Sequence, residues 1–261
     1  MPLLRRRMRM RMRRGRGRVR KRVRFVRFQR RRVGRRVGTN VCKSADLTAF
    51  SNMQPFQTRV MYGKEITQIA EGGGINQRER AIVNLRGLRV RCQFKSNHDG
   101  AGTGTNASVP LLCNIALIGA KTLDGITSGD DIDSNFFRSI GAAGRYISFS
   151  NSGINSNYRH TTPINNDKFI VLWHLRFKLG TINQNGGFSS GEFKNYRTLA
   201  RYVKIGRQIR YTGTAATTCQ DRLWVIWWFG GLEETDGNFT SAQPACTASL
   251  RFYPVFKDPR V

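Results

Sequence analysis

Apolar and polar side chains alternate along most of the chain after residue 57, with the two-residue period of β-strands. In 167–179, for example, Trp173 and Leu175 share one predicted face, and His174 and Arg176 share the other. Runs rich in Gly, Asn, Ser and Thr separate many of these segments and are typical of turns and loops. The eight strands predicted in this way cover residues 58–70, 81–94, 109–119, 144–150, 167–179, 202–211, 222–229 and 247–256.

Three segments carry more detail than simple alternation. Residues 109–119 and 222–229 are apolar at nearly every position, which predicts strands buried on both faces. In 81–94 the apolar positions are odd-numbered before Gly87 and even-numbered after it, and a slip of one residue at a glycine predicts a β-bulge. One short helix is expected at 130–140, where aspartates open the segment and apolar residues recur at helical spacing.

Many strands without regularly alternating helices predict an all-β fold. Eight strands joined by several long loops favour a double-sheet jelly roll over a tight up-and-down barrel. We assign this domain to 58–261, which is long enough to bury a sizeable core. Residues 41–57 are polar and mixed, and are predicted to form a tether between the domain and an N-terminal segment, 1–40.

Positive charge is concentrated in the segment 1–40. Between positions 5 and 36 the chain holds 18 Arg and one Lys, and its first acidic residue is Asp46. The formal net charge of +29 therefore divides into +19 in this tract and +10 in the remainder, which holds 26 basic and all 16 acidic residues. Guanidinium groups at this density cannot be buried without partners, so we expect an arm that stays disordered until it meets a polyanion.

Arginine favours phosphate among anions because its planar fork binds two oxygens at once. The tract therefore predicts nucleic-acid binding, and Phe25 and Phe28 within it are suited to stacking on unpaired bases. A basic run can also be a nuclear-targeting signal, and the two roles are compatible. A mitochondrial presequence and a membrane-surface helix are disfavoured because the tract has no Ser and no helical stripe. The predicted nucleic-acid-binding residues are Arg5, Arg6, Arg7, Arg9, Arg11, Arg13, Arg14, Arg16, Arg18, Arg20, Lys21, Arg22, Arg24, Arg27, Arg30, Arg31, Arg32, Arg35 and Arg36.

The polar face of the strand 81–94, extended by one residue, carries Arg89, Arg91 and Lys95. Such a face is more often merely solvated than functional. Beside an arginine-rich arm, a lining for nucleic acid is the alternative.

The sequence offers no evident site for catalysis, a cofactor or a metal ion. The three histidines lie in separate segments, and the five cysteines form no C-x-x-C pair, so we expect buried or free thiols in a reducing compartment. The glycine cluster 72–74 lacks the Lys-Ser/Thr of a phosphate loop and predicts a turn. No apolar run is long enough to span a bilayer. We therefore expect neither an enzyme nor membrane insertion.

The order of these features resembles the capsid proteins of small circular single-stranded DNA viruses, the circovirus and geminivirus-like group. The resemblance covers most of 58–257 and rests on several segments taken together, since none is specific alone. They are the G-I-x-x-R motif Gly74-Ile75-Asn76-Gln77-Arg78 before the strand 83–94, the buried strand 109–119 before the acidic-aromatic segment 131–138, and the final strands 224–229 and 249–256. The arm has less Tyr, Pro and His than circovirus arms, so no genus is assigned.

The resemblance implies a jelly-roll subunit, about sixty copies of which self-assemble into a T=1 icosahedral shell with the arm inside on the single-stranded DNA genome. It also implies a virion protein that enters the host nucleus through the nuclear import machinery. About sixty copies at +29 supply on the order of 1,700 positive charges, comparable with the phosphates of a genome of one to a few kilobases. Two alternatives stay open: a coat protein of a small RNA virus or satellite, because phosphate contacts do not distinguish the sugars, and a cellular basic protein such as a ribosomal or chromatin component.

Overall fold

The structure is a computed structural model that describes residues 42–57, 60–96, 111–121, 129–138, 146–147, 149, 156–180, 194–231 and 246–258. The arginine-rich segment 1–40, with its nineteen predicted binding residues, lies outside the described residues.

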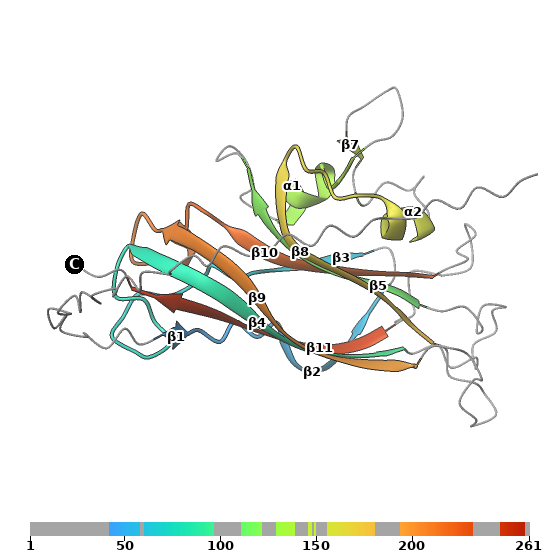
Figure 1. Cartoon of the computed structure of the whole chain (residues 1–261), viewed down its shortest axis with the longest axis horizontal. Coiled ribbons are helices and arrows are strands. Elements are labelled where there is room, and N and C mark those ends of the chain that lie inside the picture. The colour runs from blue at the N-terminus through green and yellow to red at the C-terminus, as the bar shows by residue number, and fades with distance from the viewer. Residues whose placement is uncertain are drawn as a thin grey trace, which may run out of the picture. The chain divides into compact units, whose positions relative to one another are not determined.

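Two antiparallel sheets make up the described domain and face each other across one core (Figure 1). This confirms the predicted all-β class. Sheet A contains, in spatial order, β9 (Tyr196–Arg210), β4 (Ile82–Ser96) and β11 (Cys246–Lys257), with β1 (Lys43–Ser44) and β2 (Phe50–Phe56) following one another along the far edge of β11. Sheet B runs in the order β3 (Met61–Glu65), β10 (Leu223–Gly231), β5 (Leu111–Ala120) and β8 (Phe169–Leu179). A separate two-stranded ladder joins β6 (Phe137–Arg138) to β7 (Tyr146–Ile147).

The strand pairs are nested along the chain. β1 and β2 pair with β11, β3 with β10, β4 with β9 and β5 with β8, always antiparallel. The pair formed by the earliest strands therefore encloses every later pair in sequence. The pairs fall alternately into sheet A and sheet B, so the sheets are linked at every stage of the chain.

Trp227 of β10 lies in the core between the sheets. Its ring stacks on Tyr62 of β3, with centroids 6.2 Å apart and 12° between the planes, and meets Phe56 of β2 edge-on at 6.1 Å. It also contacts Phe252 of β11 at 6.0 Å. Such aromatic pairs contribute roughly 0.5–1.5 kcal/mol each beyond the area they bury. Because the partners come from both sheets, this side chain contributes to the packing of the two layers.

A second apolar cluster covers the outer surface of sheet B, where α1 (Gly129–Ser134) and α2 (Ser156–Thr161) lie (Figure 1). The Trp228 indole N–H donates to the Arg159 carbonyl of α2 at 3.0 Å, and its ring meets Phe136 at 5.3 Å. The strands β5 and β10 are therefore buried on both faces, as their sequences predict. The buried members of the cluster are Ala116, Ile118, Ile132, Phe136, Phe137, Phe149, Ile164, Phe169, Ile226 and Trp228.

The predicted bulge in β4 is confirmed. Arg86 is skipped in the pairing with β11, and on β9 the two residues Ile205 and Gly206 lie opposite it. Gly206 has a φ of +67°, a conformation that glycine adopts without steric cost. At Gly87 a Cβ atom would lie 2.6 Å from the Val203 carbonyl oxygen, so only glycine permits this approach of β4 to β9.

Several predicted boundaries are wrong. The assignment of 41–57 to a tether fails because β1 and β2 are strands of sheet A and Phe56 is buried in the core. The exposed stretch within β2 lacks apolar alternation, because backbone hydrogen bonds to β11 rather than side-chain burial hold it. The described residues form eleven strands rather than eight, the unpredicted ones being β1, β2 and β6.

The helix predicted at 130–140 is confirmed in part: α1 lies at its start, but it is shorter than predicted and is not the only helix of the described residues. Helix α1 ends at Ser134, and the next element is the strand β6, because the consecutive residues Phe136 and Phe137 are both buried in the outer cluster. A second helix, α2, lies between the predicted strands 144–150 and 167–179, where the sequence predicts no helix, and Ala216–Thr218 form a short 3-10 turn.

Candidate nucleic-acid interface

The outward side of β4 is basic, as its alternation predicts. Arg89, Arg91 and Lys95 are exposed, whereas Val90 and Cys92 between them are buried. The strands beside β4 add further exposed cations on the same side. We call this surface the A face; its exposed basic residues are Arg86, Arg89, Arg91, Lys95, Lys204, Arg210 and Arg251.

Tyrosines flank the cations of the A face. Arg89 of β4 pairs with Tyr202 of β9 on one side and Tyr253 of β11 on the other, and Lys95 pairs with Tyr196 of β9. Residues directly opposite in antiparallel strands have Cβ atoms roughly 4.5–5.5 Å apart, so these side chains are neighbours. Tyr196 and Tyr202 are 56% and 55% exposed. The sheet register thus interleaves basic and aromatic groups on one open surface.

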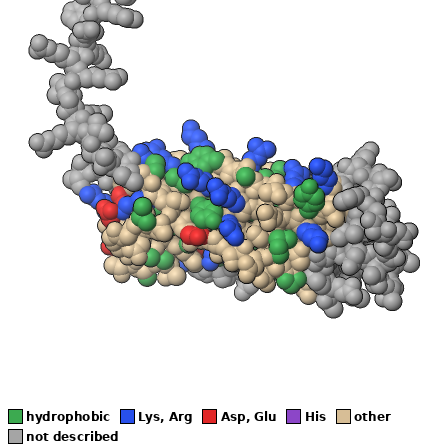
Figure 2. Space-filling model, turned by 90° about the horizontal axis from the view of Figure 1, so that it is seen from below, with side chains coloured by type: hydrophobic (Ala, Val, Ile, Leu, Met, Phe, Trp, Pro, Cys, Tyr) green, Lys and Arg blue, Asp and Glu red, His purple; other side chains and the backbone are tan. Residues whose placement is uncertain are grey.

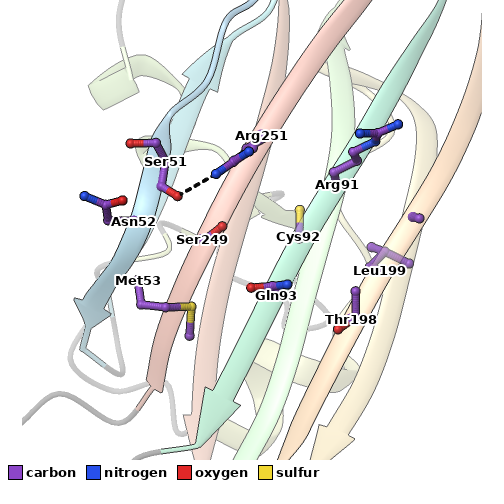
Figure 3. A pocket seen from close by; sticks show the side chains of 11 residues that line it. Ser51, Asn52, Met53, Arg91, Cys92, Gln93, Thr198, Leu199, Ser249 and Arg251 are labelled. Carbon is purple, nitrogen blue, oxygen red and sulfur yellow. Dashed lines mark hydrogen bonds between the residues drawn. The ribbon is translucent and has the colours of Figure 1, made fainter.

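Arg91 and Arg251 lie directly opposite each other on β4 and β11. The Arg251 guanidinium donates to the Ser51 carbonyl oxygen of β2 at 3.1 Å. Neither arginine forms an ion pair with any residue in the described ranges. Figure 3 shows the Arg251 side chain directed toward Ser51 and the Arg91 side chain directed away from it, so the two guanidinium groups offer two separate positions to an anion.

A shallow hollow of about 460 Å³ lies beside this arginine pair. Figure 3 shows Arg91 and Arg251 toward one end of it, with Gln93 and Thr198 farther along the strands. Its lining residues are Ser51, Asn52, Met53, Arg91, Cys92, Gln93, Thr198, Leu199, Ala200, Ser249 and Arg251. The hollow therefore spans four strands of sheet A and combines two cations with small polar and apolar groups.

Few carboxylates accompany these cations (Figure 2). Asp46, between β1 and β2, accepts a hydrogen bond from the Thr48 backbone N–H at 3.0 Å. Near β1, Lys43 is held by Glu79 and Asp258, the latter at 3.1 Å. These three carboxylates of the described residues therefore already have partners. The A face keeps its net positive charge.

Two histidines that the sequence places in separate segments meet on the other side of the molecule. Asn114 of β5 lies between them, with Nδ2 2.9 Å from Nδ1 of His160 and Oδ1 3.3 Å from Nε2 of His174. Burial, with the nearby Arg176 charge, lowers the pKa of each histidine to about 4. Both rings are thus neutral at pH 7. Sequence spacing gave no signal for this contact, because it depends on α2 packing over sheet B.

The G-I-x-x-R segment forms a closed loop around Arg78. The buried Arg78 side chain donates to the Ile69 carbonyl (3.1 Å) and the Glu71 carboxylate (2.6 Å), and its guanidinium lies 4.1 Å from the Tyr211 ring centroid. The Gly72 N–H donates to the Arg78 carbonyl at 2.8 Å, which confirms the predicted turn. Arg78 is fully engaged inside the protein, so it serves the loop and not an external phosphate.

All five cysteines are free thiols, as predicted. Cys42 is exposed, and the other four are buried. Burial raises the pKa of Cys92 to about 12 and that of Cys219 to about 11. Thiols with such pKa values remain protonated and unreactive at neutral pH.

No group of three or more His, Cys, Asp or Glu side chains in the described parts of the chain is arranged to hold a metal ion. No helix in those parts is long and apolar enough to cross a membrane. A scan against protein-family models found no family that matches the chain, and a search of curated proteins found no match either.

Proposed function

We propose that this chain is a capsid protein that self-assembles into a small icosahedral shell and packages a single-stranded DNA genome through its arginine-rich segment. The observation that carries the proposal is the nested pairing of β1/β2 with β11, β3 with β10, β4 with β9 and β5 with β8, in a domain that follows a tract of +19 charge. This order is the one expected of a jelly roll, in which an antiparallel ribbon of strand pairs is rolled into two sheets. We therefore infer that the domain is a jelly-roll subunit.

Electrostatics couples assembly to the genome in this proposal. Subunits with a formal charge of +29 repel one another, and repulsion opposes the close approach of many copies. Binding to phosphates neutralises the charge and releases counterions, which makes association favourable and salt-dependent. The same tract is suited to recognition by nuclear import factors before assembly, so the proposed locations are the host nucleus and the virion.

The full-length protein tests the proposal directly. Purified protein is examined by negative-stain electron microscopy, and its absorbance ratio at 260 and 280 nm measures bound nucleic acid. We expect closed particles that contain nucleic acid sensitive to DNase after disruption. RNase sensitivity instead would favour the RNA-virus alternative, and a monomer under all salt conditions would refute a capsid role.

Two tract variants separate charge from arginine chemistry. Replacing the 18 arginines of positions 5–36 by Gln is expected to abolish packaging, because the tract then holds a single basic residue. Replacing them by Lys retains the charge and should retain packaging in part, since point charges bind phosphate without the bidentate fork. Packaging that survives the Gln replacement would show that the tract is not the principal genome-binding element.

A further inference from the structure

The A face has the two components that single-stranded nucleic-acid surfaces combine, namely a positive track and exposed aromatic rings. Arg89, Arg91 and Lys95 lie along one side of β4, where successive same-side residues are about 7 Å apart. Tyr202 and Tyr196 of the adjacent strand stand beside the two ends of this row. Charge complementarity therefore favours a polyanion as the occupant of this face, and the rings favour one with accessible bases.

We propose that the A face is a second nucleic-acid-binding surface, selective for unpaired strands, on which the arginines and Lys95 hold phosphates and Tyr196 and Tyr202 stack on bases. This inference rests on the proposed packaging function and adds to it a site in the folded domain, separate from the arginine-rich segment. Contacts to phosphates and ring faces carry no sequence information, so binding at this surface is independent of sequence.

The rings select single strands over duplexes. In a duplex the base faces are already stacked on one another, and the edges in the grooves offer no face to a tyrosine. An unpaired strand laid along β4 can turn its bases toward β9, where both tyrosines lie. Its phosphates then lie over the row of basic residues.

Arg91 and Arg251 are the basic residues of the A face that line the hollow. The two residues lie directly opposite each other on β4 and β11 without an ion-pair partner in the described part of the chain, and the Arg251 guanidinium is held toward β2 by its bond to the Ser51 carbonyl. The adjoining hollow of about 460 Å³ leaves room for a nucleotide next to the pair. A phosphate bound at either arginine gains a charge-assisted contact.

Photochemical crosslinking within assembled particles is the primary test. Particles are loaded with DNA containing 5-iododeoxyuridine, irradiated and digested, and the crosslinked peptides are mapped by mass spectrometry. We expect crosslinks at Tyr196 and Tyr202 in addition to any within 1–41. Crosslinks confined to 1–41 would overturn this inference and leave the packaging proposal intact. Absence of particles or of packaged nucleic acid would instead count against the packaging proposal.

Binding measurements provide a second test that does not depend on assembly. The full-length chain with Gln in place of the tract arginines is titrated with a fluorescent oligo(dT) and with a duplex of equal length, and we expect tighter binding of the single strand. Tyr202→Leu should weaken oligo(dT) binding about tenfold, whereas Tyr202→Phe, which keeps the ring, should not. Equal affinity for duplex and single strand, or equal affinity of the Leu and Phe variants, would refute the stacking role.

A matched pair of charge variants checks the phosphate positions. The double variant Arg91→Gln, Arg251→Gln should lower the salt-dependence slope of oligo(dT) binding by about 1.4, as expected for two lost phosphate contacts. The control Lys121→Gln, Arg138→Gln removes the same charge from exposed residues that belong to no strand of sheet A, and should leave the slope unchanged. Equal slopes for the two double variants would show that the A face makes no phosphate contacts.

Discussion

Gly87→Ala is the sharpest test of the register of sheet A. A Cβ at this position would lie 2.5 Å from Cζ and Oη of Tyr202 and 2.6 Å from the Val203 carbonyl oxygen, both closer than a real Cβ contact allows. The tyrosine ring can swing away, but Val203 is paired within the β4–β9 ladder, so its carbonyl cannot move without distorting the sheet. The clash is therefore mainly a backbone clash.

The expected loss follows from two opposing effects. Overpacking at a rigid site costs typically 1–3 kcal/mol, and the lower entropy of the unfolded alanine chain returns about 0.4–1 kcal/mol. We expect a net loss of about 2 kcal/mol in the free energy of unfolding. For a domain of this size that corresponds to a melting temperature lower by about 4–8 °C.

Urea and thermal unfolding followed by tryptophan fluorescence measure this effect, with Gly63→Ala as the control. Gly63 is also a strand glycine, but a Cβ there would meet its nearest atom at an ordinary 3.4 Å, so its replacement should be neutral or slightly stabilising. Adding Tyr202→Ala to Gly87→Ala should recover only part of the loss, because the Val203 carbonyl remains. If Gly87→Ala were as stable as Gly63→Ala, the described approach of β4 to β9 would be incorrect.

Three further predictions concern the loop, the histidines and the thiols. Arg78→Met should lower the free energy of unfolding measured in urea by about 3 kcal/mol, because it leaves buried carbonyl groups and Glu71 without their donor. Glu71→Gln keeps an acceptor oxygen and should cost less. Equal losses for the two variants would contradict this account. The pKa values of His160 and His174 are about 4 in the folded protein and about 6.5 in the unfolded chain, so between these pH values the unfolded chain binds more protons than the folded protein. The free energy of unfolding should therefore fall as the pH drops from about 6.5 toward 4. Urea midpoints that fall equally in wild type and a double His→Gln variant would exclude this origin. A thiol reagent should modify one cysteine per native chain quickly, Cys42, and the other four only after denaturation; rapid reaction of a second thiol would contradict their burial.

Local signals predicted the parts of the fold where side-chain burial follows the strand period. In β4 the phase slip at Gly87 was visible in the order of apolar residues, so both the strand and its bulge could be predicted. In β2 most side chains are exposed and the strand is held by backbone bonds to β11, so no apolar pattern marks it. Helix α2 is polar at most positions and depends on packing over sheet B, which no short window reveals.

The candidate interface, too, could be predicted from the sequence only in part. The alternation in β4 was sufficient to place Arg89, Arg91 and Lys95 on one exposed side. Arg251 and the flanking tyrosines could not be assigned to that side, because the partner of each residue depends on the register between distant strands. The register of β4 with β9 and β11 also shifts by one residue at the bulge, so the partner of each residue follows from how the strands pair in the folded sheet. The arginine-rich segment remains a prediction from composition alone.

The position of β11 has a consequence for the synthesis of this protein. It separates β4 from β1 and β2, yet the ribosome makes it long after all three. Until Cys246 and the residues after it have emerged, those earlier strands have no partner at their shared centre, and sheet A stays open. A translation product that stops before this point lacks the middle of a sheet rather than an edge. Truncated chains therefore cannot complete sheet A, and this follows from the strand order alone.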